Sequence, residues 1–386
     1  MSTTLFSPVT VGSLSLKNHV VMAPMTRSRA IGNVPNALME TYYRQRAGAG
    51  LIVTEGTSPS PNGLGYARIP GMFTDEQVHG WRRVTDGVHE AGGKIFVQLM
   101  HTGRVSHPAN MPPGARIMAP SPLAAPGEMW TDSQGLQPYP APEAMSETDI
   151  ADAVGEYATA ARRGIEAGFD GVELHGANGY LIDQFLNTAS NQRTDRWGSG
   201  PAPARRAAES PGKPAVPAAA GPHQDAPVDQ RIENRIRFAA EVAEACAEAI
   251  GAERLGMRIS PYGVFGGMAP DADMDAVYER LIGRLNRIGV VSIHVVDHSS
   301  MGAPPVRPLL KATLRAAFNG WYILSGGYDA IRANADLDAL RGDLVAFGRP
   351  FIANPDLVER LQSGRALAVP DPATFYTPGE KGYTDY

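Results

Sequence analysis

Short apolar segments recur along the whole chain, and most are continuous apolar runs rather than alternations of apolar and polar residues. This pattern is typical of parallel strands that are buried on both faces of a sheet. We therefore predict eight strands, at His19–Pro24, Leu51–Glu55, Lys94–Met100, Asp170–His175, Arg254–Ser260, Val290–Val296, Tyr322–Ser325 and Leu344–Gly348.

Helical patterns fill the intervals between these segments. The pairs Thr74/Gln77 and Ser146/Asp149 each have the spacing of a capping box, and apolar residues follow both at helical intervals. A third apolar stripe with the same periodicity runs from Ile232 to Ile250. The chain therefore alternates between strands and helices.

Eight strands separated by helices over this length predict an α/β fold, a closed (β/α)8 TIM barrel. A doubly wound sheet with an extra domain is the alternative. The barrel is favoured because the units repeat evenly and no break in composition divides the chain. We expect residues 1–386 to form a single domain.

Two segments depart from the repeat, and both follow the carboxyl end of a predicted strand. His101–Met145 follows strand three and holds nine prolines, so we expect an ordered, irregular excursion over the barrel mouth. Gly200–Gln230 follows strand four and is rich in Pro and Ala, with almost no large apolar residue, so we expect disorder. A passive insertion is favoured over an active-site lid for this second segment.

Composition narrows the classes of function. The chain has 386 residues, a net charge of −5 and no basic block, which gives little support for nucleic-acid binding. Its apolar runs are far too short to span a bilayer, and Met1–Asn18 lack the pattern of a signal peptide. The single cysteine, Cys246, excludes an internal disulfide and a cysteine-ligated cluster. We expect a cytoplasmic enzyme with no nucleic-acid or membrane partner.

The carboxyl ends of barrel strands are where polar working residues are expected. Strands seven and eight end in Gly326-Gly327 and Gly348-Arg349. Glycine allows a close approach of the backbone to a ligand, and arginine adds a charged fork, so these ends predict a phosphate site.

Three polar residues point to the ligand that carries this phosphate. Arg258 lies inside an apolar strand and needs a partner, either the carboxylate of Glu173 or an electron-rich ligand edge. Gln98, also within a strand, offers both a donor and an acceptor. The pyrimidine edge of a flavin needs this mixture, and Thr26 is placed to donate to a flavin carbonyl.

These residues belong to eight fragments that resemble the Old Yellow Enzyme family of FMN-dependent ene-reductases. The fragments occur in the family's order and cover essentially the whole chain outside Gly200–Gln230. Thr26 places the sequence nearer the classical branch than the branch with cysteine at that site. The fragments are Ala23–Arg27, Gln98–Arg104, Val172–Tyr180, Asn191–Asp195, Glu233–Arg235, Arg258–Pro261, Phe347–Arg349 and Gly382–Tyr386.

The resemblance implies bound FMN, with NAD(P)H as the reductant and an enone, enal, imide or nitroalkene as the substrate. It implies that His175 and Asn178 face the substrate carbonyl, that Tyr180 delivers a proton, and that Tyr376 and Met100 line the pocket. Met100 stands where several relatives carry tryptophan, which leaves the substrate range open. The cofactor-binding residues that it implies are Pro24, Met25, Thr26, Gly56, Gln98, Arg258, Gly326, Gly327, Gly348 and Arg349.

Three other classes of barrel protein remain as alternatives. A metal-dependent hydrolase would use His101, His175, His298 and Glu55, but no tight ligand spacing recurs, and we predict no metal site. A Schiff-base aldolase needs a lysine at the carboxyl end of a strand, and no lysine occupies such a position. A non-catalytic ligand-binding barrel stays open. The sequence also leaves open the physiological substrate, the choice between NADH and NADPH, and the oligomeric state.

Overall fold

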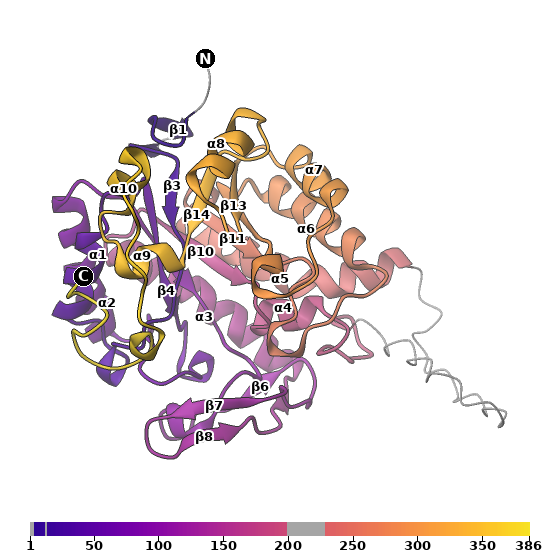
Figure 1. Ribbon diagram of the computed structural model, residues 1–386. Coiled ribbons are helices and arrows are strands. Elements are labelled where there is room, and N and C mark those ends of the chain that lie inside the picture. Colours follow the sequence, from indigo (N-terminus) through magenta and orange to yellow (C-terminus); the bar gives the residue numbers. More distant parts are fainter. Residues whose placement is uncertain (1–3, 12–13, 199–227) are drawn as a thin grey trace, which may run out of the picture.

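The computed structural model describes residues 4–11, 14–198 and 228–386, and its centre is a closed barrel of eight parallel strands (Figure 1). The strands follow one another around the barrel in chain order, and each predicted strand is confirmed. They are β3 (Val20–Met22), β4 (Leu51–Thr57), β5 (Ile95–Leu99), β10 (Gly171–Gly176), β11 (Leu255–Ile259), β12 (Ser292–Val296), β13 (Trp321–Ser325) and β14 (Leu344–Phe347).

Every observed strand differs from its predicted bounds by one or two residues at one end or both, and two of these differences bear on the site. Strand β3 ends before Pro24, because proline has no N–H to donate to a neighbouring strand. Strand β4 continues past Glu55, because its pairing with β5 shifts between Val53 and Gly56 and then resumes. The shift brings Gly56 opposite Gln98, so two predicted site residues become neighbours.

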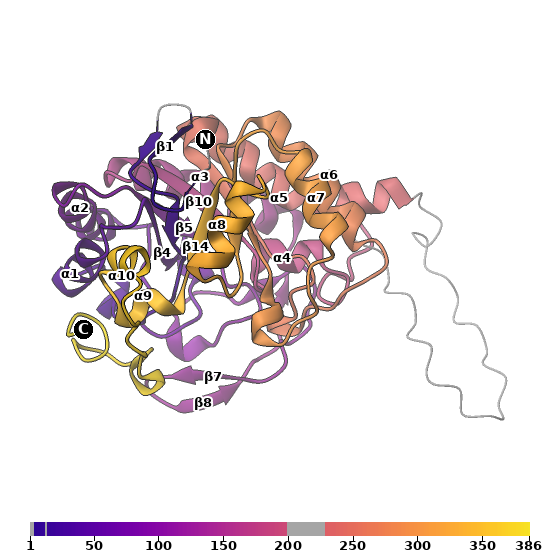
Figure 2. The same ribbon diagram turned by 45° about the horizontal axis from the view of Figure 1, so that its top comes forward.

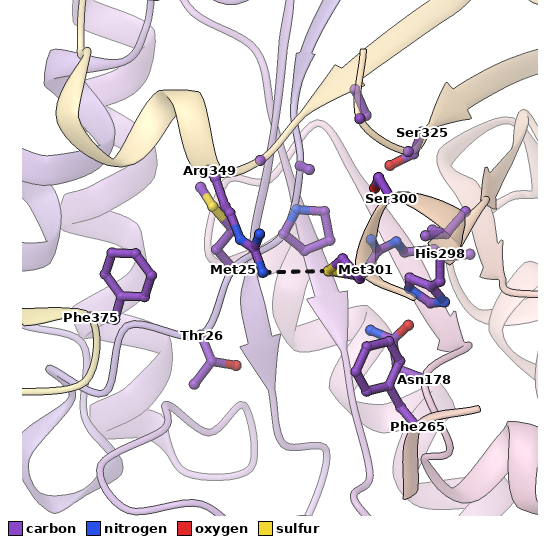
Figure 3. Close-up of a pocket in the computed structure, with 18 of the residues that line it drawn as sticks. Met25, Thr26, Asn178, Phe265, His298, Ser300, Met301, Ser325, Arg349 and Phe375 are labelled. Atoms are coloured by element: carbon purple, nitrogen blue, oxygen red, sulfur yellow. Dashed lines mark hydrogen bonds between the residues drawn. The ribbon is translucent and has the colours of Figure 1, made fainter. Parts of the chain in front are cut away.

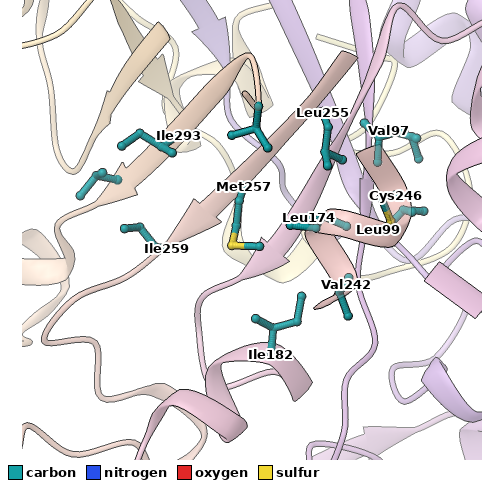
Figure 4. Packing of buried hydrophobic residues seen from close by; sticks show 14 of the residues in the cluster. Val97, Leu99, Leu174, Ile182, Val242, Cys246, Leu255, Met257, Ile259 and Ile293 are labelled. Atoms are coloured by element: carbon teal, nitrogen blue, oxygen red, sulfur yellow. The ribbon is translucent and has the colours of Figure 1, made fainter. Parts of the chain in front are cut away.

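Successive strand residues face opposite sides of the barrel wall, and the core divides accordingly. One apolar cluster, which includes Val97, Leu174 and Met257, packs between the strands and the helices, with Cys246 in the same layer (Figure 4). A second cluster, which includes Val21, Phe96 and Ile323, fills the lumen from β3, β4, β5, β13 and β14. Hydrophobic burial on both faces explains why the strand segments are continuous apolar runs.

The other side of the lumen is polar. Gln98 on β5, Glu173 on β10, Arg258 on β11 and His294 on β12 alternate with residues of the outer cluster and are all buried. The barrel interior therefore has an apolar half and a polar half. The side chains of the polar half come from β5, β10, β11 and β12, four of the strands that lead to the predicted site.

Helices surround the barrel, and both predicted capping boxes are confirmed at Thr74 and Ser146. The helices are α1 (Ala37–Gln45), α2 (Asp75–Glu90), α3 (Glu147–Glu166), α4 (Leu181–Leu186), α5 (Val228–Ile250), α6 (Met274–Ile288), α7 (Pro308–Ala316), α8 (Ala330–Asp338), α9 (Arg349–Ala353) and α10 (Leu357–Ser363). Short 3-10 turns lie at Ile31–Asn33, Pro61–Gly63, Pro108–Asn110, Ala252–Arg254, Phe265–Gly267, His298–Met301 and Pro372–Thr374. Within the described ranges, no helix has the length and apolar character needed to cross a membrane.

The excursion after β5 is ordered, as predicted, but it is more regular than expected. It contains an antiparallel hairpin of β7 (Glu128–Thr131) and β8 (Gly135–Pro138) and a parallel pair of β6 (Met118–Ala119) and β9 (Glu143–Ala144). Figures 1 and 2 place the hairpin and the C-terminal segment at the same end of the barrel. A further small sheet pairs β1 (Val9–Val11) with β2 (Leu14–Leu16).

The segment Gly200–Gln230 was predicted to be disordered. Its residues 200–227 lie outside the described residues. Its last three residues contradict the prediction, because α5 begins at Val228. Asp229 forms an ion pair with Arg280 of α6, and Gln230 donates to Asn234 one turn further on. These contacts extend the helix beyond the apolar stripe from which it was predicted.

Candidate active site

Two adjoining cavities, of about 740 and 990 Å³, open at the carboxyl end of the barrel. Every predicted cofactor, catalytic and substrate residue lines at least one of them. Because they share walls, the two cavities form one continuous site, here called the mouth site. The residues common to both are Pro24, Thr26, Tyr66, Tyr139, Asn178, Tyr180, Arg258 and Tyr376.

The smaller cavity contains the predicted phosphate end. Gly326 and Gly327 have φ angles of +132° and +62°. A Cβ atom on Gly326 would lie 2.3 Å from the Asp297 carbonyl oxygen, and one on Gly327 would lie 2.8 Å from Ser300 Cβ. Only glycine combines a positive φ angle with the absence of a Cβ. A ligand can therefore approach the bare backbone closely here.

Arg349 extends over the same cavity from the end of β14 (Figure 3). Its side chain is exposed, and among the described residues its guanidinium makes one hydrogen bond, a long 3.6 Å approach to Met301 Sδ. A thioether is a weak acceptor. The guanidinium is therefore available to an anion, as a phosphate site requires.

The polar half of the lumen supplies the floor of the larger cavity. Each carboxylate oxygen of Glu173 already has a partner: Gln98 Nε2 donates to one at 2.8 Å, and His294 Nδ1 lies 2.8 Å from the other. Arg258 lines both cavities, and its buried Nε has no partner among the described residues. Burial lowers the pKa of Arg258, and the charge of Glu173 opposes this effect.

A buried guanidinium with an unpaired N–H is costly unless a ligand completes its hydrogen bonds. Glu173 attracts Arg258 electrostatically, but its oxygens already accept from Gln98 and His294. Of the two partners considered from the sequence, the geometry thus favours an electron-rich ligand edge.

His175 is oriented as a hydrogen-bond donor at the wall of the larger cavity. Its Nδ1 accepts the Ala177 N–H at 3.3 Å, which leaves the ring proton on Nε2. Burial, followed by the nearby charge of Arg258, holds the pKa of His175 well below its usual value. The ring is therefore neutral at pH 7 and has one N–H to offer.

Asn178 lies three residues further on in a left-handed backbone conformation, with φ +61°, which asparagine tolerates better than most residues. Its N–H donates to Ser260 Oγ at 3.0 Å, which fixes the turn. Its Oδ1 is buried without a partner among the described residues, and its side chain lines both cavities. His175 and Asn178 thus present two unsatisfied polar groups to the mouth site.

Tyr180 completes this group. Its ring packs edge-on against His175, with centroids 4.8 Å apart, and its hydroxyl donates to Tyr66 Oη at 3.1 Å. Burial of the hydroxyl raises the pKa of Tyr180 to about 12. The phenol therefore keeps its proton at neutral pH, which suits a proton donor.

Comparison with known proteins identifies the kind of enzyme. The family model described as NADH:flavin oxidoreductase / NADH oxidase matches residues 4–208 and 229–368. The chain belongs to this family. It is an oxidoreductase that uses flavin, and its resemblance to the Old Yellow Enzyme family is confirmed.

Individual relatives are similar over nearly their whole lengths. A probable flavin mononucleotide-dependent alkene reductase of Leishmania infantum is 41% identical over 99% of this chain and 96% of its own. Morphinone reductase in complex with tetrahydroNAD is 42% identical with a TM-score of 0.86, covering 99% of this chain and 97% of its own. The old yellow enzyme homologue from Zymomonas mobilis is 36% identical with a TM-score of 0.87, covering 99% of both chains.

The mouth site fits the flavin that this family uses. Gly326 and Gly327, where the tight packing against Asp297 and Ser300 admits no side chain, present bare backbone to the smaller cavity, and the cation of Arg349 lines the same cavity. The unpaired Nε of Arg258 and the amide of Gln98 lie at the other end of the site. An anionic phosphate and a ring edge with mixed donors and acceptors complement these two ends.

Gly56 and Met100 are coupled to each other. A Cβ on Gly56 would lie 2.5 Å from Met100 Sδ, so any side chain at position 56 would displace the end of the Met100 side chain. Met100 is fully buried and packs with Leu64 and Ile69, and Tyr180 contacts the same cluster. Met100 therefore shapes the floor of the larger cavity. Tyr376, by contrast, is 61% exposed and forms part of the cavity rim.

Several lining residues were not predicted, because they come from segments outside the barrel strands. Tyr66 follows the turn after β4, Trp130 and Tyr139 come from the excursion, and Phe265 and Phe375 lie in later loops. Nothing in their local sequence marks them, since only the folded chain brings them to the barrel mouth.

The residues considered for a metal hydrolase are held by separate partners. His101 Nδ1 accepts the Gly103 N–H, and Glu55 accepts from the Arg27 N–H and the Tyr43 hydroxyl. His175 and His298 line the mouth site from β10 and from the turn after β12. In the part of the chain that the structure describes, no three His, Cys, Asp or Glu side chains converge to hold a metal.

The loop that carries Asn178 and Tyr180 is anchored by Asp183. The Gly179 N–H donates to Asp183 Oδ2 at 2.8 Å, and the Tyr278 hydroxyl lies 3.4 Å from Oδ1. Burial raises the pKa of Asp183 to about 7. The folded protein therefore holds this proton up to a pH at which an unfolded aspartate, with a pKa near 3.8, has lost it.

This difference predicts how stability depends on pH. Since the folded state binds the extra proton, the unfolding free energy contributed by Asp183 falls as pH rises from about 4 to about 7. Asp183→Asn keeps an acceptor for Gly179 and cannot ionise. Between pH 5 and pH 8, we expect urea unfolding to show the variant gaining about 2–3 kcal/mol relative to the original protein.

The exposed substitution Asp86→Asn is the matched control and should show no such gain. An Asp183→Asn difference that stays constant from pH 5 to pH 8 would mean that Asp183 is already ionised in the folded protein.

Proposed function

We propose that the protein is an FMN-dependent ene-reductase, which uses NAD(P)H to reduce the activated carbon–carbon double bond of a small molecule. One observation carries this proposal: the neutral His175, the side-chain amide of Asn178, whose Nδ2 can donate, and the protonated Tyr180 line one cavity, beside the site that fits a flavin. An alkene conjugated to an oxygen-bearing group needs this combination of an oxygen site and a proton donor.

The residues that would hold FMN lie along the mouth site. Gly326, Gly327, Gly348 and Arg349 would bind its phosphate, Gln98 and Arg258 its pyrimidine edge, and Pro24, Met25, Thr26 and Gly56 the rest of the ring system. When bound, FMN supplies hydride transfer, from the nicotinamide to the β-carbon of the alkene. The tetrahydroNAD complex of morphinone reductase supports a nicotinamide as the reductant.

His175 and Asn178 hydrogen-bond the substrate oxygen, where negative charge develops as the double bond is reduced. Each pre-aimed donor of this kind is worth about 3 kcal/mol in a water-excluded site. Tyr180 gives its proton to the α-carbon. The substrates are α,β-unsaturated aldehydes, ketones and imides and nitroalkenes, and Met100 and Tyr376 limit their shape from the floor and the rim.

A turnover experiment tests this function. FMN-loaded protein, supplied anaerobically with NADH or NADPH, should convert 2-cyclohexenone to cyclohexanone with one nicotinamide oxidised per product. In D₂O, the product should carry deuterium at the α-carbon. Oxidation of the nicotinamide without any saturated ketone would contradict the proposal.

Arg349→Ala tests the phosphate end alone. Because a hydrogen bond to a charged group contributes about 1.5–3 kcal/mol, FMN should bind about 10- to 100-fold more weakly to the variant. Riboflavin lacks the phosphate and is the matched control, so its affinity should not change. Fluorescence titration of the apoprotein measures both. An equal loss of affinity for both ligands would mean that Arg349 acts on the fold and not on the phosphate.

A further inference from the structure

Tyr66 lies beside the proposed proton donor and has no role in the function described so far. It lines both cavities, and its hydroxyl accepts the hydrogen bond of Tyr180 at 3.1 Å. The two rings meet edge-on, with centroids 6.1 Å apart. In the described structure, no other hydrogen bond is recorded for the Tyr180 hydroxyl.

The position of Tyr66 is fixed by its surroundings. The residue before it, Gly65, leaves no space for a side chain, since a Cβ there would lie 2.5 Å from Thr102 Oγ1. The Tyr66 ring packs against the buried cluster of Leu64, Ile69 and Met100. Tyr66 is therefore held beside Tyr180 before any substrate arrives.

Proton donation leaves a negative charge on Tyr180, and the neighbouring Tyr66 hydroxyl can stabilise that charge. Tyr180 becomes a phenolate when it gives up its proton, and a charge without a partner is costly where water is excluded. Burial raises the pKa of Tyr180 to about 12, and the hydrogen bond with Tyr66 works in the opposite direction. Burial, followed by the charge of Tyr180, also raises the pKa of Tyr66 well above 10, so Tyr66 keeps its own proton.

We propose that Tyr66 is the positioning partner of the proton donor: it accepts from Tyr180 in the resting site and donates to the Tyr180 oxygen once the proton has left. This inference rests on the proposed function, in which Tyr180 protonates the substrate. A phenol hydroxyl can accept and donate, and its hydrogen rotates about the C–O bond, so the reversal needs no movement of the ring.

The step balances as follows in atoms and electrons. As hydride reaches the β-carbon, the substrate takes on enolate character at the oxygen bound by His175 and Asn178, and protonation of the α-carbon is coupled to this transfer. The O–H bond of Tyr180 breaks, a C–H bond forms at the α-carbon, and the O–H electron pair stays on Tyr180 as a phenolate. Tyr66 turns its O–H to that oxygen as the proton leaves, and a proton from water afterwards restores the Tyr180 phenol.

Tyr66→Phe tests the pair by separating the two halves of the reaction in stopped-flow measurements on flavin-loaded enzyme. Reduction by the nicotinamide should change less than about 2-fold, whereas reoxidation by 2-cyclohexenone should slow about 10- to 100-fold, the effect of losing a hydrogen bond to a charged group. Tyr322→Phe is the matched control, because it removes another buried tyrosine hydroxyl, on β13, that has no partner among the described residues.

A double-mutant cycle separates this role from a general effect on the fold. In the Tyr180→Phe background no phenolate forms, so Tyr66→Phe should have no further effect on reoxidation. Equal slowing in both backgrounds, or no slowing in either, would overturn the inference. If Tyr180→Phe alone leaves reoxidation unchanged, the proposed role of Tyr180 fails, and the Tyr66 inference fails with it.

A measurement on the unmodified enzyme is independent of any folding defect. The reoxidation rate, measured across mixtures of H₂O and D₂O, should curve with the deuterium fraction, because two hydroxyl hydrogens change their bonding. A straight line would mean that one hydrogen is involved and would contradict the role of Tyr66.

Discussion

His175→Ala combined with Asn178→Ala is expected to keep the flavin and to lose binding and reduction of the enone. His175 lines only the larger cavity and Asn178 lines both, whereas Gly326, Gly327 and Arg349 line only the smaller one. With about 3 kcal/mol for each donor in the transition state, the rate of enone reduction should fall about 10⁴-fold. Titration of the flavin spectrum with 2-cyclohexenone should show no saturable binding.

His79→Ala combined with Asn319→Ala makes the same chemical change at two exposed positions and should behave like the unmodified protein. If the cavity double variant binds 2-cyclohexenone with unchanged affinity, the oxygen site has been assigned to the wrong residues. Loss of the flavin would place His175 and Asn178 in cofactor binding instead.

Tyr180→Phe is expected to slow reoxidation by an enone about 10²- to 10⁴-fold, which is the range for loss of a positioned general acid. Reduction of the flavin by NAD(P)H needs no such acid and should be nearly unchanged. Stopped-flow absorbance at the flavin band measures each half-reaction separately.

The pKa of Tyr180 also predicts how the reoxidation rate depends on pH. A group with a pKa of about 12 is protonated throughout the range from pH 6 to pH 9, so the reoxidation rate should be flat across it. A rate that falls with an apparent pKa near 7 would indicate a different donor. A Tyr180→Phe rate equal to that of the unmodified enzyme would assign protonation to water.

The barrel was predictable from the sequence because its strands are buried on both faces and therefore read as continuous apolar runs. The positions of the strand ends followed from this, and with them Gly326, Gly327, Gly348 and Arg349. The polar residues of the lumen could also be predicted from the sequence, since Gln98 and Arg258 interrupt otherwise apolar strands.

The hairpin β7–β8 was missed because its first strand carries no local signal. Residues 128–131 alternate between exposed and buried, but the exposed pair includes the apolar Trp130 and the buried pair includes the polar Thr131. Polarity along this stretch therefore does not follow burial, and the prolines around it favoured an irregular excursion. Trp130 and Tyr139, which the excursion places at the cavity, were missed with it.

Other features depend on contacts that no local pattern reports. Arg27 follows the site residue Thr26 in a matching fragment, yet its side chain donates to the Gly382 and Phe375 carbonyl oxygens. Tyr383, in another matching fragment, stacks on Tyr42 with centroids 4.0 Å apart. These residues attach the C-terminal segment beside the mouth site, so their part in the motif is structural.

The most direct test of the central claim is an absorption spectrum of the purified protein, followed anaerobically by NADPH and then by 2-cyclohexenone. Flavin bands should be present, should bleach with NADPH and should return with the enone, which would establish both half-reactions in one cuvette. Bands that bleach and do not return would contradict the substrate class. The absence of a flavin band, even after FMN is added, would contradict the cofactor and the function built on it.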